Sequence, residues 1–370
     1  MNARFNDNTR SQSAMDRPAT PLNQSALSVR NLWKVYGAAP RDFASADGPT
    51  LSREHLAKRG WVAAGRAATF EVARGEVFVI MGLSGSGKST LLRCLPWLIE
   101  PTTGDLFFDQ KDLRRIPDTE LVELRRNRMG MVFQSFALLP NRTVLSNVEF
   151  PLEVQRRQKT MRRERAMQMI EMVGLSGFEN RRPSELSGGQ QQRVGIARSL
   201  ALDPELWLLD EPFSALDPLI RRDLQGEVLR IQGELAKTIV FITHDLDEAI
   251  RMADRIAIMK DGEIVQIGTP QDLVLDPAND YVARFVESIA PAKVVQAERL
   301  LLHSGQVDAG APTTDHDETV QQFAPLIVEG DTPFAVQRNG AIIGMLDRIA
   351  SLRVLAGKVG RVDVPSTNDG

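Results

Sequence analysis

Residues 82–90 read GLSGSGKST and follow directly on the apolar run VFVIM at residues 77–81. The string matches the pattern G-x-x-x-x-G-K-[ST], in which glycines let several backbone N–H groups converge on phosphate oxygens. A strand before this loop and a helix from Lys88 onward would direct the positive end of the helix dipole at the same anion. The stretch therefore predicts a phosphate-binding loop at the edge of an α/β sheet.

The loop residues are also the expected ligands of the phosphates and of a magnesium ion. Lys88 would reach the β- and γ-phosphates, and the Ser89 hydroxyl would join the Mg²⁺ shell. The other residues of the loop expected to hold the nucleotide are Gly82, Ser84, Gly85, Ser86, Gly87 and Thr90. An ordinary glycine-rich turn is the alternative, but the flanking strand and helix argue against it.

A second motif closes an apolar run at residues 206–211, LWLLDE. Such a run predicts a buried strand whose carboxyl end delivers two carboxylates beside the phosphates. Asp210 would hold the Mg²⁺ shell, and Glu211 would act as general base toward the attacking water. A buried strand that meets an acidic helix cap has the same pattern, so the phosphate-binding loop in the same chain is what favours the catalytic interpretation.

Residues 186–190, LSGGQ, form a second candidate anion site. A Ser-Gly-Gly turn that opens a helix offers free N–H groups and the positive end of a helix dipole. The residues concerned are Ser187, Gly188, Gly189 and Gln190. One nucleotide needs only one phosphate-binding loop, so we expect this second device to serve the nucleotide of another subunit. An ordinary helix start is the alternative.

Three weaker signals lie between and after these motifs. Gln134 ends a predicted strand and could reach Mg²⁺ or the attacking water, and His244 follows an apolar strand and could contact the γ-phosphate. Asp217, in the string SALD at residues 214–217, could line a subunit contact. Each residue alone is more typical of a structural role, and their order relative to the strong motifs favours function.

The motifs together resemble those of the ATP-binding subunits of ABC transporters, over residues 28–290. In that family's terms they are Walker A (82–90), the Q-loop (Gln134), the signature (186–190), Walker B (206–211), the D-loop (214–217) and the H-switch (His244). The resemblance implies an α/β fold, the P-loop NTPase ABC cassette, with a RecA-like mixed sheet core, an antiparallel β subdomain and a helical subdomain at about residues 118–190. A short CBS-like α+β segment would follow at the C-terminus.

The resemblance also implies ligands and partners. ATP and Mg²⁺ would be bound by two copies of the chain in a head-to-tail dimer, with each ATP between the Walker A loop of one copy and the signature of the other. Integral-membrane permease subunits would dock their coupling helices near Gln134, and an extracytoplasmic solute-binding protein would act indirectly. Tyr36 matches the aromatic residue that stacks on adenine; an edge-strand aromatic is the alternative.

Within that family the chain is similar to the ATPase subunits of glycine betaine and proline importers. An insertion separates Tyr36 from the strand expected at Thr69, and strings such as SALDPLIR at residues 214–221 are typical of this group. The similarity implies uptake of a quaternary amine such as glycine betaine, proline betaine, choline or carnitine. The alternatives are an importer of another solute, such as an amino acid, polyamine or sugar, a non-transport ABC ATPase, and a regulatory protein that binds a ligand at its C-terminal segment.

Composition limits the partners and the location of the chain. The net charge of −3 gives no electrostatic footprint for nucleic acid, and the single cysteine, Cys94, fits a reducing compartment. No stretch approaches the length of about 20 apolar residues that spans a bilayer. We therefore expect a peripheral protein at the cytoplasmic face of the inner membrane, attached through its permease.

The expected organisation has four parts. A disordered polar tail (1–25) precedes the ABC ATPase domain (26–276), and a connecting segment and linker (277–322) precede a partial CBS-like segment (323–360). Residues 333–355 resemble half of one CBS module, with either a sensing or a packing role. The basic run 156–165 could touch anionic lipid or form a solvated helix face.

Local signals predict several boundaries. Asp118 is the expected N-cap of a helix over 118–128, Gly174 is expected to end a helix over 161–173, and Asp261-Gly262 is a hairpin turn. Pro96 should end or kink the helix that starts at Lys88.

Overall fold

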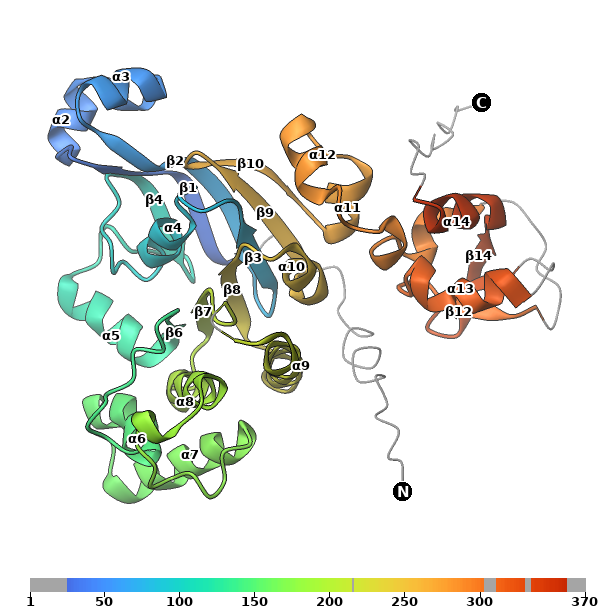
Figure 1. The fold of residues 1–370 in the computed structure, drawn as a ribbon. Helices are drawn as coiled ribbons and strands as arrows, with labels where there is room; N and C mark the ends of the chain where they lie inside the picture. The colour runs from blue at the N-terminus through green and yellow to red at the C-terminus, as the bar shows by residue number, and fades with distance from the viewer. Residues whose placement is uncertain (1–24, 215, 303–310, 330–333, 358–370) are drawn as a thin grey trace. The chain divides into compact units, whose positions relative to one another are not determined.

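The computed structural model describes residues 25–214, 216–302, 311–329 and 334–357 (Figure 1). The predicted N-terminal tail therefore lies outside the described residues, except for Ser25. The chain divides into two compact units, residues 1–265 and 266–370, and each is described by itself.

A six-stranded sheet forms the centre of the first unit. In spatial order its strands are β10 (Glu263–Gly268), β9 (Arg255–Lys260), β3 (Val77–Met81), β8 (Thr238–Thr243), β7 (Leu206–Asp210) and β6 (Met129–Val132). The five strands from β9 to β6 are parallel. Every residue of β3, β7 and β8 is buried, which explains their unbroken apolar sequences. Their carboxyl ends meet at one edge, where the polar motifs follow.

An antiparallel sheet forms a second layer of this unit. Its strands, in spatial order, are β2 (Val62–Ala73), β1 (Ser25–Tyr36), β4 (Thr103–Phe108) and β5 (Lys111–Asp112). The tip of the β1–β2 hairpin carries the insertion, which folds as α2 (Pro40–Ser45), the 3-10 turn η1 (Gly48–Thr50) and α3 (Arg53–Lys58). Phe43 and Leu56 of the insertion are buried against Trp33 and Val35 of β1, so the insertion has a small apolar core of its own.

The helices of the first unit connect and cover the central sheet. They are α4 (Lys88–Cys94), α5 (Asp118–Arg128), α6 (Val144–Val154), α7 (Lys159–Met172), the 3-10 turn η2 (Pro183–Glu185), α8 (Gly188–Ala201), α9 (Pro218–Leu235) and α10 (Leu246–Met252). Helix α4 packs on β2, β7 and β8, while α6, α7 and α8 pack on one another beyond the β6 edge (Figure 1). The helical region expected at about 118–190 thus contains α5, α6 and α7 and ends where α8 begins.

Two local expectations need correction, and one that left two outcomes open is decided. The N-cap of α5 is Pro117, and Asp118 is its first helical residue, where its charge still faces the positive end of the helix. Strand β2 begins at Val62 rather than Thr69, because cross-strand pairing with β1 extends into an alanine-rich stretch of weak strand preference. Helix α4 ends at Cys94, before Pro96, so the proline ends the helix without kinking it.

Two predicted turns are confirmed. Gly174 follows the end of α7 with a left-handed φ of 67°, and Asp261-Gly262 joins β9 to β10 with positive φ at both residues.

The second unit contains further helices and a small sheet. Its elements are α11 (Pro270–Leu275), α12 (Asp280–Val286), η3 (Pro291–Lys293), η4 (Ala297–Leu300), β11 (Leu301–Leu302), β12 (Thr313–Asp315), α13 (Val320–Glu329), β13 (Ala335–Arg338), β14 (Ala341–Leu346) and α14 (Arg348–Leu355). The sheet has the order β11-β14-β13-β12. The strand-turn-strand-helix expected over 333–355 is present as β13, β14 and α14, while its likeness to a CBS module stays a prediction.

The stretch expected to be a linker is structured in its described part. Residues 277–302 contain α12, η3, η4 and β11, and β12 pairs in parallel with β13. Strand β12 has only three residues, too few for an alternating pattern to reveal it in a polar sequence. The small sheet therefore begins earlier in the chain than predicted.

Candidate functional site

The phosphate-binding loop lies between β3 and α4, as its sequence predicts. Gly87 is the N-cap of α4 with φ 97°, and a Cβ atom there would lie 1.8 Å from the Ala64 carbonyl oxygen. A Cβ at Gly82 would lie 2.2 Å from the Met259 carbonyl oxygen. Neighbouring backbone thus approaches the loop so closely that only glycine fits at these two positions.

Lys88 is the buried cation of this loop. Its Nζ donates to the carbonyl oxygens of Gly82 (2.8 Å) and Leu83 (3.0 Å), and the residue is 5% exposed. An ammonium has three donors, so these two bonds leave one for a phosphate oxygen. Burial lowers the pKa of Lys88, and the nearby carboxylates of Glu211 and Asp210 oppose that shift.

Asp210 ends β7 with a carboxylate that is almost fully buried. Its Oδ2 accepts hydrogen bonds from Arg93 of α4, from Nε at 3.1 Å and from Nη2 at 2.9 Å. Its Oδ1 is buried and has no hydrogen-bond partner among the described residues, and neither has the Ser86 hydroxyl in the loop. A buried carboxylate oxygen without a hydrogen-bond partner is a suitable ligand for a hard cation such as Mg²⁺, so the residues present are suited to that ion.

Glu211 brings three segments of the chain together. Its Oε2 accepts a hydrogen bond from Gln134 Nε2 at 3.3 Å and lies 3.3 Å from His244 Nδ1. Gln134 follows β6, Glu211 follows β7 and His244 follows β8, which are neighbouring strands of the parallel sheet. Glu211 has a φ of 45°, a strained value for this residue type, so its position is over-determined by its surroundings.

Tyr36 lies at the end of β1, opposite Val62 of β2. Tyr36 is 43% exposed, and Lys34 Nζ lies 5.1 Å from the centroid of its ring. The same Nζ donates a hydrogen bond to the Glu100 carbonyl oxygen. An exposed ring polarised by a cation is able to stack on a base. The insertion begins directly after this residue.

The signature residues form the start of α8. The Ser187 Oγ accepts from the Gln190 backbone N–H at 3.3 Å, and the Gln190 Oε1 accepts from the Ser187 N–H at 2.9 Å. This reciprocal capping box is exposed. Gly188 and Gly189 form the first turn, and a Cβ at Gly189 would lie 2.6 Å from the Ile220 Cγ2 of α9.

The D-loop leads into α9. Asp217 is the N-cap of that helix, and its Oδ1 accepts from the N–H groups of Leu219 (3.2 Å) and Ile220 (3.1 Å). The carboxylate at the position predicted for a subunit contact is thus held by its own helix.

The structure places the predicted residues in two groups. In the first group, Gln134 and His244 contact Glu211 at the carboxyl ends of the central strands. Lys88 and Asp210 belong to the same group, because the charge of Lys88 interacts with those of Asp210 and Glu211. The signature residues lie at the start of α8, where their hydrogen bonds are local. Arg93 was not predicted from the sequence, because its partner Asp210 is distant in the chain. The one available signal was the position of Arg93 on the helix that follows the phosphate-binding loop.

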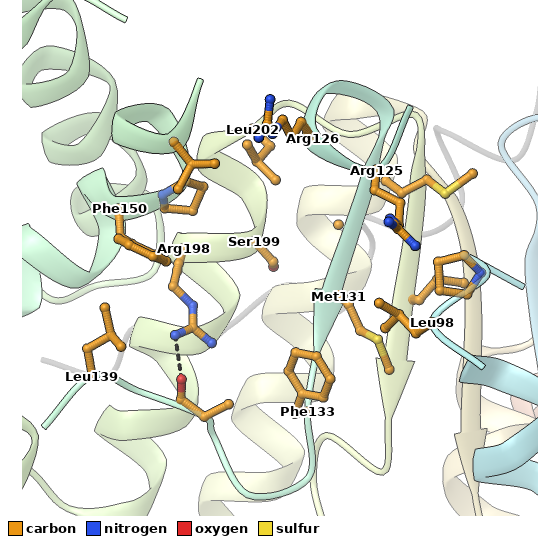
Figure 2. Close-up of a pocket in the computed structure, with 17 residues that line it drawn as sticks. Leu98, Arg125, Arg126, Met131, Phe133, Leu139, Phe150, Arg198, Ser199 and Leu202 are labelled. Carbon is orange, nitrogen blue, oxygen red and sulfur yellow. Dashed lines mark hydrogen bonds between the residues drawn. The ribbon is translucent and has the colours of Figure 1, made fainter. Parts of the chain in front are cut away.

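An apolar groove opens between β6 and the helices α6 and α8 (Figure 2). Its volume is about 390 Å³, and its apolar lining includes Leu98, Met131, Phe133, Leu139, Phe150 and Leu202. Arg198 of α8 donates from Nη1 to the Ala137 carbonyl oxygen at 2.6 Å and from Nη2 to that of Phe136 at 3.1 Å. Since Phe133 immediately precedes Gln134, the groove adjoins the segment that reaches Glu211.

The fold and the site define a P-loop nucleotide-binding protein in which a buried aspartate, Asp210, precedes a half-buried glutamate, Glu211. A family model described as ABC transporter matches residues 66–214. The trimethylamine N-oxide transport system ATP-binding protein TmoW of Ruegeria pomeroyi is 52% identical over 90% of this chain and 98% of its own. The chain therefore belongs to the ABC transporter family, among its ATP-binding proteins, as predicted.

Two further comparisons extend this result. The glycine betaine/proline betaine transport system ATP-binding protein ProV of Escherichia coli is 47% identical over 74% of this chain and 68% of its own. A dimeric structure of the ATP-binding cassette MJ0796, in a post-hydrolysis state with ADP and phosphate, is 35% identical. It has a TM-score of 0.56 and covers 66% of this chain and 98% of the cassette. The predicted ABC-cassette fold is confirmed.

Within the described residues, no helix combines the length and the apolar character needed to cross a membrane.

Proposed function

We propose that two copies of this chain hydrolyse ATP in a head-to-tail dimer and drive uptake of a small solute with a methylated quaternary nitrogen. The observation that carries the catalytic part is the convergence of Gln134 and His244 on one oxygen of Glu211. The dimeric cassette structure supports a second copy as the partner.

Glu211 is the proposed general base. As a water molecule attacks the γ-phosphorus and the bond to the β-phosphate oxygen breaks, the Glu211 carboxylate accepts the proton of that water. Gln134 and His244 hold the carboxylate and line the position of the transferred phosphoryl group. Lys88 contributes positive charge where negative charge develops on the phosphate oxygens.

Ser89 and Asp210 are the proposed protein ligands of Mg²⁺. Bound Mg²⁺ would neutralise phosphate charge during transfer. Among the described residues no three His, Cys, Asp or Glu side chains gather as a metal site, so the phosphates and water must complete the shell. Arg93 holds Asp210 Oδ2 and leaves Oδ1 for the ion.

The remaining nucleotide contacts come from both copies. Tyr36 would stack on the adenine, and the loop amides with Ser84, Ser86 and Thr90 would hold the phosphates. Ser187, Gly188, Gly189 and Gln190 of the second copy would close on the γ-phosphate, with Asp217 at the subunit contact.

The permease is proposed to dock in the apolar groove beside Gln134. A short amphipathic helix fits such a groove by burying its apolar face against the lining residues. Binding of this helix would then shift the segment from Phe133 to Gln134. Because Gln134 contacts Glu211, the shift would also change the position of the Glu211 carboxylate. Docked in this way, the chain would lie at the cytoplasmic face of the inner membrane, with a solute-binding protein on the other side.

The solute is inferred from relatives. TmoW is named for trimethylamine N-oxide transport and matches nearly along its whole length, whereas ProV is named for glycine betaine and proline betaine and is covered over 68%. All three solutes carry a methylated cationic nitrogen beside an anionic oxygen group. We propose this class, with trimethylamine N-oxide as the first candidate and glycine betaine as the second.

Reconstitution tests the proposal. The chain, its permease and its solute-binding protein are placed in liposomes, and ATP hydrolysis is measured with trimethylamine N-oxide, glycine betaine, choline, proline and a polyamine. The expected result is stimulation by a trimethylated solute that disappears in Glu211→Gln. Stimulation by proline or the polyamine alone would overturn the solute assignment, and stimulation that survives in Glu211→Gln would overturn the catalytic one.

A further inference from the structure

A joint of hydrogen-bonded polar side chains, Arg221, Gln225, Asp245, Glu248 and Arg251, connects α9 to α10. Arg221 Nη1 donates to Asp245 Oδ2 at 3.0 Å, and Gln225 Nε2, one turn further along α9, donates to Glu248 Oε1 at 2.9 Å. Arg251 Nη1 donates to the Gln225 Oε1 at 3.2 Å. Gln225 and Glu248 are both 5% exposed, and burial raises the pKa of the Glu248 carboxyl. Hydrogen bonds between buried polar groups favour one relative position of the two helices.

One end of this joint reaches the D-loop. Arg221 Nη2 donates to the Leu216 carbonyl oxygen at 3.2 Å while Nη1 holds Asp245. Leu216 directly precedes Asp217, the residue proposed to meet the second copy of the chain. The same guanidinium therefore contacts the segment that a partner subunit would displace.

The other end reaches His244. Asp245 follows it in the chain, and three bonds hold Asp245 in place: its N–H donates to the Thr243 Oγ1 at 3.0 Å, its Oδ1 accepts from the Glu248 N–H at 3.1 Å, and its Oδ2 accepts from Arg221. The backbone that carries the imidazole is thus fixed on the same carboxylate that Arg221 binds.

The contacts close into a ring through Glu211. His244 Nδ1 lies 3.3 Å from the Glu211 Oε2, and the Ser214 hydroxyl donates to the Glu211 carbonyl oxygen at 3.1 Å. Ser214 opens the D-loop, and Leu216 returns the ring to Arg221. The D-loop and His244 are joined twice, once through Glu211 and once through Arg221.

We infer that Arg221 is a positioning residue, which couples the position of the D-loop to that of His244. The inference rests on the proposed roles of Glu211 and His244. Arginine suits this task because its planar fork donates in two directions at once, here to a carboxylate and to a backbone carbonyl. A displacement of Leu216 by the second copy would then move Asp245, and His244 with it.

A double-mutant cycle separates this role from simple stabilisation. The variants are Arg221→Met, His244→Ala and the double variant, each reconstituted with the permease, with Arg221→Lys as the conservative variant and Arg222→Met as control. Arg222 is the exposed neighbour on the same helix. The readouts are kcat, nucleotide affinity measured with a fluorescent ATP analogue, and the melting temperature of each variant.

We expect Arg221→Met to lower kcat by about 10- to 100-fold, because a small misplacement of a catalytic group has effects of that size. Nucleotide affinity should stay within about twofold, since Arg221 is not a phosphate contact. Added to His244→Ala, the second change should lower kcat no further, because Arg221 acts through the imidazole. Arg221→Lys should recover part of the rate, and Arg222→Met should behave as the unmodified chain.

Three outcomes of this experiment would overturn the inference. If the effects of Arg221→Met and His244→Ala multiply, Arg221 does not act through His244 and the inference is overturned while the proposed function stands. A loss in Arg221→Met that follows only from a lowered melting temperature, and that vanishes when assayed well below it, overturns the inference as well. A normal rate in His244→Ala removes the proposed role of His244, and the inference falls with it.

Discussion

Helices α4 and α8 both begin with a serine- and glycine-rich turn, yet their first residues have opposite surroundings. At α4 neighbouring backbone approaches the loop closely at Gly82 and Gly87, the lysine is buried, and two carboxylates lie near it. At α8 the serine is exposed and the glutamine is half-buried, and the side chain of each accepts a hydrogen bond from the backbone N–H of the other. The proposed catalytic groups of the chain lie beside one helix start, and the side-chain hydrogen bonds of Ser187 and Gln190 at the other are local.

Under the proposed function, this difference is the reason that a chain with two candidate anion-binding turns would act as a dimer. In the proposed function, the α4 loop supplies the groups for phosphate binding and hydrolysis but does not cover the nucleotide, whereas the α8 turn covers the nucleotide and supplies no such groups. In the proposed head-to-tail dimer, the exposed α8 turn of each chain meets the nucleotide bound to the other chain, so every nucleotide has both the α4 groups and a cover.

The largest effect should come from Glu211, on the α4 side. Glu211→Gln removes the base but keeps a side-chain oxygen that can accept from Gln134, so we expect kcat to fall by about 1000-fold with ATP binding retained. The measurement is steady-state hydrolysis beside nucleotide binding on the same preparation. A variant that hydrolyses ATP at the normal rate would show that the base lies elsewhere.

Gly87→Ala tests the enclosure of the α4 loop. Its new Cβ would meet the Ala64 carbonyl oxygen at 1.8 Å and would require a positive φ, so we expect ATP affinity to weaken by about 30-fold or more. The matched control is Gly85→Ala, which has a positive φ but open space around its Cβ and should lose less. Binding is followed by titration with a fluorescent nucleotide, and equal losses in both variants would refute the role of the close contact.

Ser187→Arg tests the α8 turn. The bulky cation should block closure of the two copies, so cooperative hydrolysis should fall by at least about tenfold while the affinity of the single subunit for ATP changes by less than about twofold. Ser187→Ala, which removes only the cap, should have a smaller effect on both. The measurements are the Hill coefficient of hydrolysis and ATP-dependent dimer formation by light scattering. Cooperative hydrolysis that persists in Ser187→Arg would contradict the assignment.

The smallest effect should come from Tyr36. Tyr36→Ala removes a stacking surface, and we expect nucleotide affinity to weaken by about fivefold, with kcat at saturation unchanged. Tyr36→Phe keeps the ring and should bind normally. Titration with ATP and with inorganic triphosphate separates the two contributions, because only ATP offers a base to stack on; an equal loss for both ligands would exclude stacking.

The sequence was sufficient for the elements whose signals are local. The run before Gly82, the strand 206–210 and the helix after Ser187 combine apolar pattern, loop residues and caps, and all three occur as predicted. The three-residue β12 and the alanine-rich start of β2 were missed, because strand pairing rather than intrinsic preference forms them.

The residues of the candidate site were predictable as a set, and their contacts were not. Motif order predicted Gln134, Glu211 and His244. Only the parallel order of β6, β7 and β8 shows that Gln134 and His244 both approach the Glu211 carboxylate. Arg93 and Arg221 were invisible as site residues, because each depends on a partner more than twenty positions away in the chain. An arginine on a helix face gives no hint of such a partner.

The most direct test of the composite site mixes two inactive chains. Lys88→Ala disables the α4 loop and Ser187→Arg disables the α8 turn, so a mixed head-to-tail dimer contains one site with both defects and one with neither. Random mixing gives such dimers in half of the population, and we predict recovery to about a quarter of the normal ATPase rate. A mixture that stays as inactive as its components, although cross-linking shows that mixed dimers form, would contradict the shared site.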